Sequence, residues 1–249
     1  MKIIISPAKK MIVNQDDFDI QGLPVYLEKA QELLTAMQQL DYEAAKKLWH
    51  TSDKLTQPNY DHLQNLDLTK HLTPAILSFS GIQYQYLAAD LLTTPALDYL
   101  QRNLRILSGF YGILKPFDGI APYRLEMGAR LSVSGTQNLY DFWGNDLYQA
   151  ISAEKEPIIN LASKEYSKAI TSYLQSPDQF IDITFVHEVD GQLKTRATLA
   201  KMARGEMVRF MAENQLENPT DLKNFDSPNY QFSPAHSTAT KFVFIRTKP

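Results

Sequence analysis

Short apolar runs separated by segments with helical spacing are the feature that most constrains the fold of this chain. The runs that we interpret as buried strands are residues 3–6, 75–79, 104–107, 157–161 and 242–245. Helical spacing of apolar residues is found at 25–41, 42–49, 83–92, 95–101, 164–174 and 202–214. A pair of strands, 180–189 and 193–199, flanks Asp190-Gly191, which is a strong hairpin signal. This alternation predicts an α/β fold with a mixed, largely buried sheet covered by helices.

The composition is even from end to end, without repeats, low-complexity tracts or a long linker. With 249 residues, 44% of them hydrophobic, the chain can bury a sizeable core. We therefore predict a single domain over residues 1–249.

Small polar residues and glycines recur where the predicted strands end. The four places are Ser6-Pro7-Ala8-Lys9, Ser80-Gly81, Ser108-Gly109 and Ala162-Ser163. In open α/β sheets, ligands bind at the carboxyl ends of the strands, so this recurrence predicts a site there. The alternative is that turns simply favour these residue types.

Charge and cysteine content exclude several classes of protein. The formal net charge is −3, so a polyanion is bound only if positive charge gathers on one face. The chain has no cysteine, which excludes disulfides, thiolate catalysis, zinc fingers and Cys-ligated iron–sulfur clusters. The N-terminal apolar run is only three isoleucines, and no stretch approaches a membrane span, so we expect a cytoplasmic protein without membrane contact.

Motifs for metal and cofactor binding are not recognisable. The five histidines show no spacing typical of metal ligands, and there is no Walker loop, G-x-G-x-x-G or G-x-S-x-G. We predict no metal site and no cofactor.

Several cations can hold an anion: Arg124 lies in the Pro- and Gly-rich loop 105–127, and the others follow strand ends or lie on predicted helices. The candidates are Lys9, Arg124, Lys164, Lys168, Lys201 and Arg204. Arginine offers a bidentate fork for phosphate or carboxylate, and a helix N-terminus presents free N–H groups. For each residue the alternative is an ordinary solvated cation or an internal ion pair.

Three carboxylates are candidate acid or base groups. Glu126 lies two residues beyond Arg124, so in an extended stretch both side chains point to one side. Glu165 follows a strand end, and Asp141 stands in an aromatic cluster where we expect it to require a partner such as Lys or Arg from another loop. A Gly205 inside the helix at 202–214 predicts close approach of another segment or a ligand.

Five blocks of this sequence resemble the YaaA family of bacterial peroxide-stress proteins. They are ISPAKK at the N-terminus, SDKL at 52–55, LSGFYGILKPFDGIAPYRLEMG at 107–128, LYDFWG with NLASKEYSK within 139–168, and AKMARGEMVRF at 200–210. The blocks span almost the whole chain in the family's order, and the long central block is highly specific.

The resemblance implies a single mixed α/β domain in the cytoplasm. It also implies survival of peroxide stress, lower free intracellular iron, and DNA binding through a helix-hairpin-helix-like element and a positively charged cleft. A helix-hairpin-helix usually carries Gly-x-Gly, whereas here Gly109 and Gly112 are three apart; we keep both glycines as candidate DNA contacts through their backbone N–H groups.

Two functions remain open from the sequence. In the first, the six cations line a basic cleft and contact the phosphates of duplex or distorted DNA with little sequence preference. In the second, the same convergence, with Glu126, Asp141 and Glu165 as candidate catalytic groups, forms the active site of an enzyme for a small anionic or nucleotide-like molecule.

Overall fold

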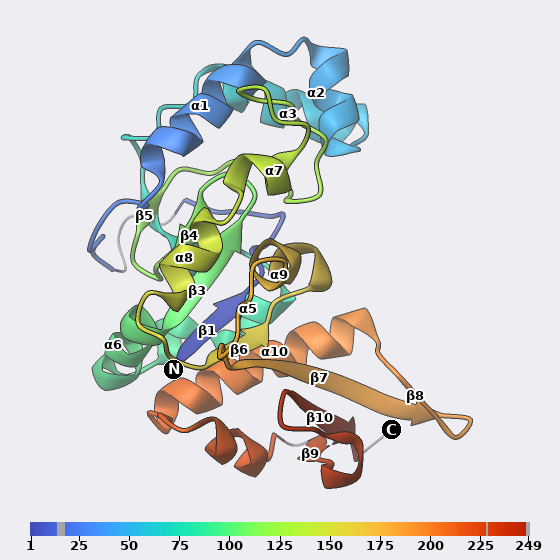
Figure 1. Ribbon diagram of the computed structural model, residues 1–249. Coiled ribbons are helices and arrows are strands. Elements are labelled where there is room, and N and C mark those ends of the chain that lie inside the picture. The colour runs from blue at the N-terminus through green and yellow to red at the C-terminus, as the bar shows by residue number, and fades with distance from the viewer. Residues whose placement is uncertain (14–17, 228, 248–249) are drawn as a thin grey trace.

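A mixed sheet forms the centre of the protein in the computed structural model, which describes residues 1–13, 18–227 and 229–247 (Figure 1). Its strands lie in the order β4-β3-β1-β6-β7-β10-β9, and β8 pairs with β7. The strands are β1 (Lys2–Ile5), β3 (Leu104–Ser108), β4 (Gly112–Leu114), β6 (Ile158–Leu161), β7 (Phe180–Val189), β8 (Gln192–Lys194), β9 (Tyr230–Phe232) and β10 (Lys241–Arg246).

The middle of this sheet is parallel. Strand β1 pairs in parallel with β3 and with β6, and β7 pairs in parallel with β6 and with β10. Strands β4, β8 and β9 are antiparallel to their partners. The predicted mixed α/β class is confirmed. As a result, the carboxyl ends of β3, β1 and β6 lie at one edge of the sheet.

Helices cover the sheet and build a separate group beside it. The helices are α1 (Leu27–Gln38), α2 (Tyr42–Trp49), α3 (Asp53–Gln64), α4 (Ala75–Ser78), α5 (Ile82–Leu87), α6 (Thr94–Asn103), α7 (Leu139–Trp143), α8 (Asp146–Ser152), α9 (Lys164–Thr171) and α10 (Ala197–Glu213). Helix α6 packs on β3, α8 on β4 and α10 on β7, while α1, α2 and α3 pack together at the far end of the molecule (Figure 1). One continuous hydrophobic core joins these layers, from Met1 to Phe244.

Helix α10 lies unusually close to α5. A Cβ at Gly205 would stand 2.2 Å from the carbonyl oxygen of Gln83, so only glycine allows this approach. The glycine that the sequence singled out inside this helix is therefore explained by helix–helix packing.

Two of the predicted strands are wrong. Residues 75–78 form the single helical turn α4, because a short apolar run fits a buried helix as well as a strand. The segment 193–199 is a strand only to Lys194, and α10 already begins at Ala197, five residues before the predicted helix. The short strands β2 (Thr73–Pro74), β5 (Gly119–Ile120), β4 and β9 were not predicted, nor were α7 and α8.

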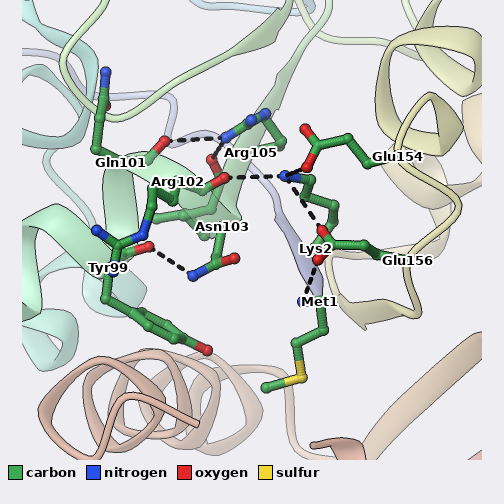
Figure 2. A network of polar contacts seen from close by, with 10 residues as sticks. Met1, Lys2, Tyr99, Gln101, Arg102, Asn103, Arg105, Glu154 and Glu156 are labelled. Carbon is green, nitrogen blue, oxygen red and sulfur yellow. Dashed lines mark hydrogen bonds and ion pairs between the residues drawn. The ribbon is translucent and has the colours of Figure 1, made fainter. Parts of the chain in front are cut away.

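The amino end of β1 is closed by a network of charges (Figure 2). The Lys2 ammonium lies 2.9 Å from Glu154, 3.3 Å from Glu156 and 3.2 Å from the carbonyl oxygen of Arg102, to which it donates. Glu156 also lies 3.2 Å from the N-terminal ammonium. Burial alone would raise the pKa of Glu156, but the two ammonium groups outweigh it and lower that pKa.

Among the helices that the structure describes, none combines the length and apolar character needed to cross a membrane.

Candidate anion-binding cleft

A cleft of about 530 Å³ opens at the carboxyl ends of β1 and β6. Five parts of the chain line it. They are residues 6–10, residues 80–84, residues 123–126, Ser163 with Glu165 and Tyr166, and Lys201 with Arg204. The site that we predicted at the strand ends would lie here, with the correction that Ser80-Gly81 follows α4 and not a strand.

Hydrogen bonds fix the floor of the cleft. The hydroxyl of Ser6, after β1, accepts the backbone N–H of Ser163, after β6, at 2.8 Å. The Tyr84 hydroxyl donates to the carbonyl oxygen of Ser6 at 2.9 Å. Ser6 and Ser163 therefore join the two strand ends, and α5 is held against them.

The segment that carries Arg124 and Glu126 is held from several sides. The hydroxyls of Tyr123 and Ser108 are hydrogen-bonded at 2.7 Å, and the carbonyl oxygen of Pro122 lies 2.8 Å from His62 Nε2. A Cβ at Gly109 would stand 2.7 Å from the carbonyl oxygen of Leu125, so this glycine lets the β3 end touch the segment's backbone. Arg124 and Glu126 are thus presented on a well-supported stretch.

The structure brings four of the six candidate cations to this cleft: Lys9, Arg124, Lys201 and Arg204. Lys9 is 67% exposed at its side chain and makes a 2.7 Å ion pair with Glu126. Glu126 therefore pairs with Lys9, and Arg124 takes part in no ion pair within 4 Å among the described residues.

Buried N–H donors without an acceptor gather in the same cleft. Arg124 Nε, Arg204 Nε and Gln83 Nε2 are all buried and have no hydrogen-bond partner among the described residues. Burial lowers the pKa of the Arg204 guanidinium, and Asp182 acts in the opposite direction. Because an unpaired buried donor costs free energy, a ligand that brings oxygen acceptors is favoured here.

The candidate acids divide between the cleft and the surface. Glu165 lines the cleft, and its carboxylate accepts the backbone N–H of Gly128 at 2.9 Å. Asp141 is exposed and does not line the cleft; Asn138 caps α7 by accepting the backbone N–H of Asp141, and its side-chain amide donates to the Asp141 carboxylate at 2.7 Å. The expected Lys or Arg partner of Asp141 is therefore wrong; a neighbouring asparagine takes that place.

Two of the candidate lysines and both glycines do not line the cleft. Lys164 and Lys168 are exposed on α9, and the Lys168 ammonium lies 4.5 Å from the centre of the Tyr140 ring. Gly109 and Gly112 lie in a buried turn between β3 and β4, where Gly112 has φ +75° against Trp143. These glycines belong to a strand–turn–strand hairpin and not to a helix-hairpin-helix.

A helical hairpin does exist elsewhere in the chain. Helices α2 and α3 pack together and are joined by residues 50–52, with His50 in the left-handed conformation at the end of α2. Lys46 on α2 pairs with Asp53 at the start of α3 at 2.6 Å. This pair is a helical hairpin, although residues 50–52 carry no glycine.

Three tyrosines and Gln83 complete the cleft and were not predicted as site residues. Burial raises the pKa of Tyr84, Tyr123 and Tyr166, so these phenols stay protonated and neutral near pH 7. Gln83 is a glutamine buried on a helix. Its burial becomes apparent only once α5 packs against α10, so the sequence alone did not mark it as a site residue. Within the described residues, no group of three or more His, Cys, Asp or Glu side chains is placed to hold a metal ion.

The sequence matches known proteins over most of its length. Residues 1–236 match the family described as Peroxide stress protein YaaA. A UPF0246 protein of Lactiplantibacillus plantarum is 62% identical over 245 residues, covering 98% of this chain and 99% of that protein. UPF0246 proteins of Pediococcus pentosaceus and Limosilactobacillus reuteri are 54% and 50% identical, each over 100% of this chain and over 99% and 100% of their own lengths.

Proposed function

This chain belongs to the YaaA family of peroxide stress proteins, and on that premise we propose that it binds DNA through the cleft at the carboxyl ends of β1 and β6. The observation that carries the proposal is the set of unpaired donors. Arg124, Arg204 and Gln83 all line one cleft, and each carries a buried N–H that has no acceptor among the described residues; Lys9 and Lys201 line the same cleft. Phosphate oxygens satisfy such donors and favour arginine forks.

The size of the cleft limits how DNA is held. A volume of about 530 Å³ falls within the range of small-molecule pockets, about 300–1,000 Å³. The cleft therefore takes a phosphate or a short stretch of one strand, and the body of a duplex stays outside. Distorted or frayed DNA, in which one strand is free, fits this geometry better than intact duplex.

Binding of this kind connects to peroxide stress through radical chemistry. Ferrous iron and peroxide generate hydroxyl radical, which damages DNA. A protein that covers DNA shields it, and lower free iron, which the resemblance to the family also implies, acts on the same chemistry.

The test is fluorescence anisotropy with labelled duplex and bubble-containing DNA across a salt series. We expect affinity to fall steeply with salt, and Lys201→Ala and Arg204→Ala each to weaken binding severalfold and to reduce the salt slope by about one. Lys164→Ala is the matched control, because Lys164 is an exposed lysine that does not line the cleft. Absence of binding by the wild type at low salt, or equal losses in the control, would contradict the proposal.

A second function is favoured by the cleft volume and by its acids. Glu126 and Glu165 lie beside Lys9 and the two arginines, which is an arrangement of an enzyme for a small phosphorylated molecule. Thermal shift with inorganic phosphate and with nucleotides tests it. Stabilisation by a nucleotide that Arg204→Ala abolishes, together with no DNA binding, would favour the enzyme over the DNA-binding protein.

A further inference from the structure

Strand β7 continues beyond the sheet as a two-stranded ribbon with β8. Its residues 180–182 pair with β6 and residues 182–186 with β10, whereas His187, Glu188 and Val189 pair only with β8. Figure 1 shows β7 and β8 projecting from the body of the molecule. All residues of β8 are exposed, whereas His187 and Val189 on the β7 side of this ribbon (residues 187–194) are half-buried.

Charge separates between the two faces of the ribbon. His187 lies opposite Lys194, and Glu188 lies opposite Leu193. Because paired residues share a face and neighbouring residues alternate, His187 and Lys194 lie on one face and Glu188 on the other. One face of the ribbon therefore carries the cation Lys194, and the acidic residue Glu188 lies on the other face.

Two arginines extend this cationic face. Ile245 pairs with Val186, so the next residue, Arg246, lies beside His187. Arg196 follows β8 and immediately precedes α10. Burial first, and then the charges of Arg196, Arg246 and Lys194, lower the pKa of His187, so these side chains lie close enough to act on one another.

Three cations of this face are without an ion pair in the described part of the chain. Among the described residues, Lys194, Arg196 and Arg246 take part in no ion pair within 4 Å, and Arg246 Nε is buried without an acceptor. Glu206 on α10 accepts its hydrogen bond from Ser227. Like charges in neighbouring positions of a sheet destabilise it, so this grouping favours an external anion.

The position of the face relates it to the cleft. Arg196 precedes α10, and the same helix carries Lys201 and Arg204 in the cleft. Five residues of helix rise about 7.5 Å, so the first turns of α10 connect the end of the ribbon to a residue that lines the cleft.

We propose that the cationic ribbon face, charged by Lys194, Arg196 and Arg246 beside His187, contacts the phosphate backbone of duplex DNA. The major groove of B-DNA, about 12 Å wide, admits a two-stranded β-ribbon. The ribbon holds the duplex that the cleft is too small to contain, while the cleft takes one strand at a distorted or frayed position. This inference rests on the proposed DNA binding and names its duplex contact.

The test compares charge-removing variants on duplex and on single-stranded DNA by anisotropy across a salt series. The ribbon variant is Lys194→Gln with Arg196→Gln, and the matched control is Lys155→Gln, an exposed lysine near the amino end of β6, at the opposite edge from the cleft. One phosphate contact accounts for a factor of about eight in affinity between 0.1 M and 1 M salt. We expect the ribbon variant to lose about two units of salt slope on duplex, with a smaller loss on single strands.

The outcomes separate the two proposals. If the wild type binds duplex DNA and the ribbon variant binds it equally well, with the same salt slope as Lys155→Gln, the ribbon does not contact DNA. DNA binding at the cleft is then unaffected. Absence of DNA binding by the wild type removes both. Unchanged circular dichroism and melting temperature establish that the ribbon variant is folded, and Lys194→Glu with Arg196→Glu must then weaken duplex binding further than the glutamine pair.

Discussion

The two ends of strand β1 place cations beside carboxylates in opposite ways. At the amino end, Lys2 is 6% exposed at its side chain and meets two carboxylates and a carbonyl oxygen (Figure 2). At the carboxyl end, Lys9 is 67% exposed and has one carboxylate, Glu126. The neighbouring Arg124 and Arg204 keep a buried Nε without an acceptor.

This difference separates charges that hold the fold from charges that hold a ligand. A buried ammonium needs its partners, because one uncompensated buried charge costs several kcal/mol. Unpaired guanidinium groups in an open cleft gain their partners from outside the chain. Removing a cation should therefore cost stability at the amino end and binding at the carboxyl end.

The largest effect is expected at Lys2. Lys2→Ala leaves Glu156 with only the N-terminal ammonium and should lower the free energy of unfolding by about 2–3 kcal/mol, less than for a fully buried pair because both carboxylates are partly exposed. Urea denaturation measures this loss, and DNA affinity of the folded variant should stay unchanged. Lys155→Ala is the control, since Lys155 is exposed beside the same network. A loss of DNA affinity in Lys2→Ala equal to that in Arg204→Ala would remove the distinction between the two ends.

The next effect concerns the helix that carries two cleft cations. Gly205→Ala forces α10 away from α5, because its Cβ meets backbone at 2.2 Å. Overpacking of this kind costs about 1–3 kcal/mol, and the better helix propensity of alanine offsets about 1 kcal/mol. We expect a lower melting temperature together with weaker DNA binding, since Arg204 moves with the helix.

Gly22→Ala is the matched control for Gly205→Ala. Its Cβ meets only Asp118 Oδ1, at an ordinary 3.6 Å, and Gly22 lies outside the cleft. Normal DNA affinity in a destabilised Gly205→Ala protein would show that the cleft does not depend on this helix contact.

The sequence identifies the central strands because they are buried on both faces. Strands β3 and β6 are mostly apolar, with one polar residue inside each, Arg105 and Asn160, and each run is followed by a turn residue, which is close to the pattern of a parallel sheet. Residues 75–78 have the same pattern and form a helix, so the run alone cannot distinguish the two. The two-residue strand β5 pairs with the distant β2 and leaves no local pattern in the sequence.

The residues of the candidate site were likewise predictable from the sequence only in part. The sequence placed Lys9 after a strand, Arg124 in a loop, and Lys201 with Arg204 on one helix face, and the structure brings these residues together. Lys164 and Lys168 were predicted as site residues by the same argument. In the structure, however, α9 buries Tyr166, Ser167, Ala169 and Ile170, so the two lysines on its other side face solvent. Gly109 serves the site indirectly, by close contact with the backbone of residues 125–127, which only the packed structure reveals.

A smaller effect is expected in how the charge network at the amino end of β1 contributes to stability at low pH. The pKa of Glu156 is lowered from its ordinary value of 4.5, so its stabilising contribution is present above about pH 4.5 and is lost as the pH falls through the folded-state pKa. Glu156→Gln should lower the free energy of unfolding at pH 7 by about 1 kcal/mol or less, since the pair is partly exposed. Denaturation between about pH 3 and about pH 7 should show wild type and variant converging as the pH falls. A constant difference across that range would assign the loss to packing and not to ionisation.

The smallest change in stability is expected at Glu126, where a substitution should strengthen DNA binding and not weaken it. Its ion pair with the exposed Lys9 is worth about 0–1 kcal/mol, so Glu126→Gln should leave the melting temperature nearly unchanged. The same substitution frees the Lys9 ammonium and removes a negative charge from the cleft, so DNA affinity at low salt should rise severalfold and fall more steeply with salt. Glu154→Gln is the matched control, because it removes an exposed carboxylate from Lys2 at the other end of β1 and should change DNA affinity little. An equal rise in both variants would mean that only net charge matters, whereas a rise confined to Glu126→Gln locates the anion beside Lys9 and marks Glu126 as the carboxylate that the ligand displaces.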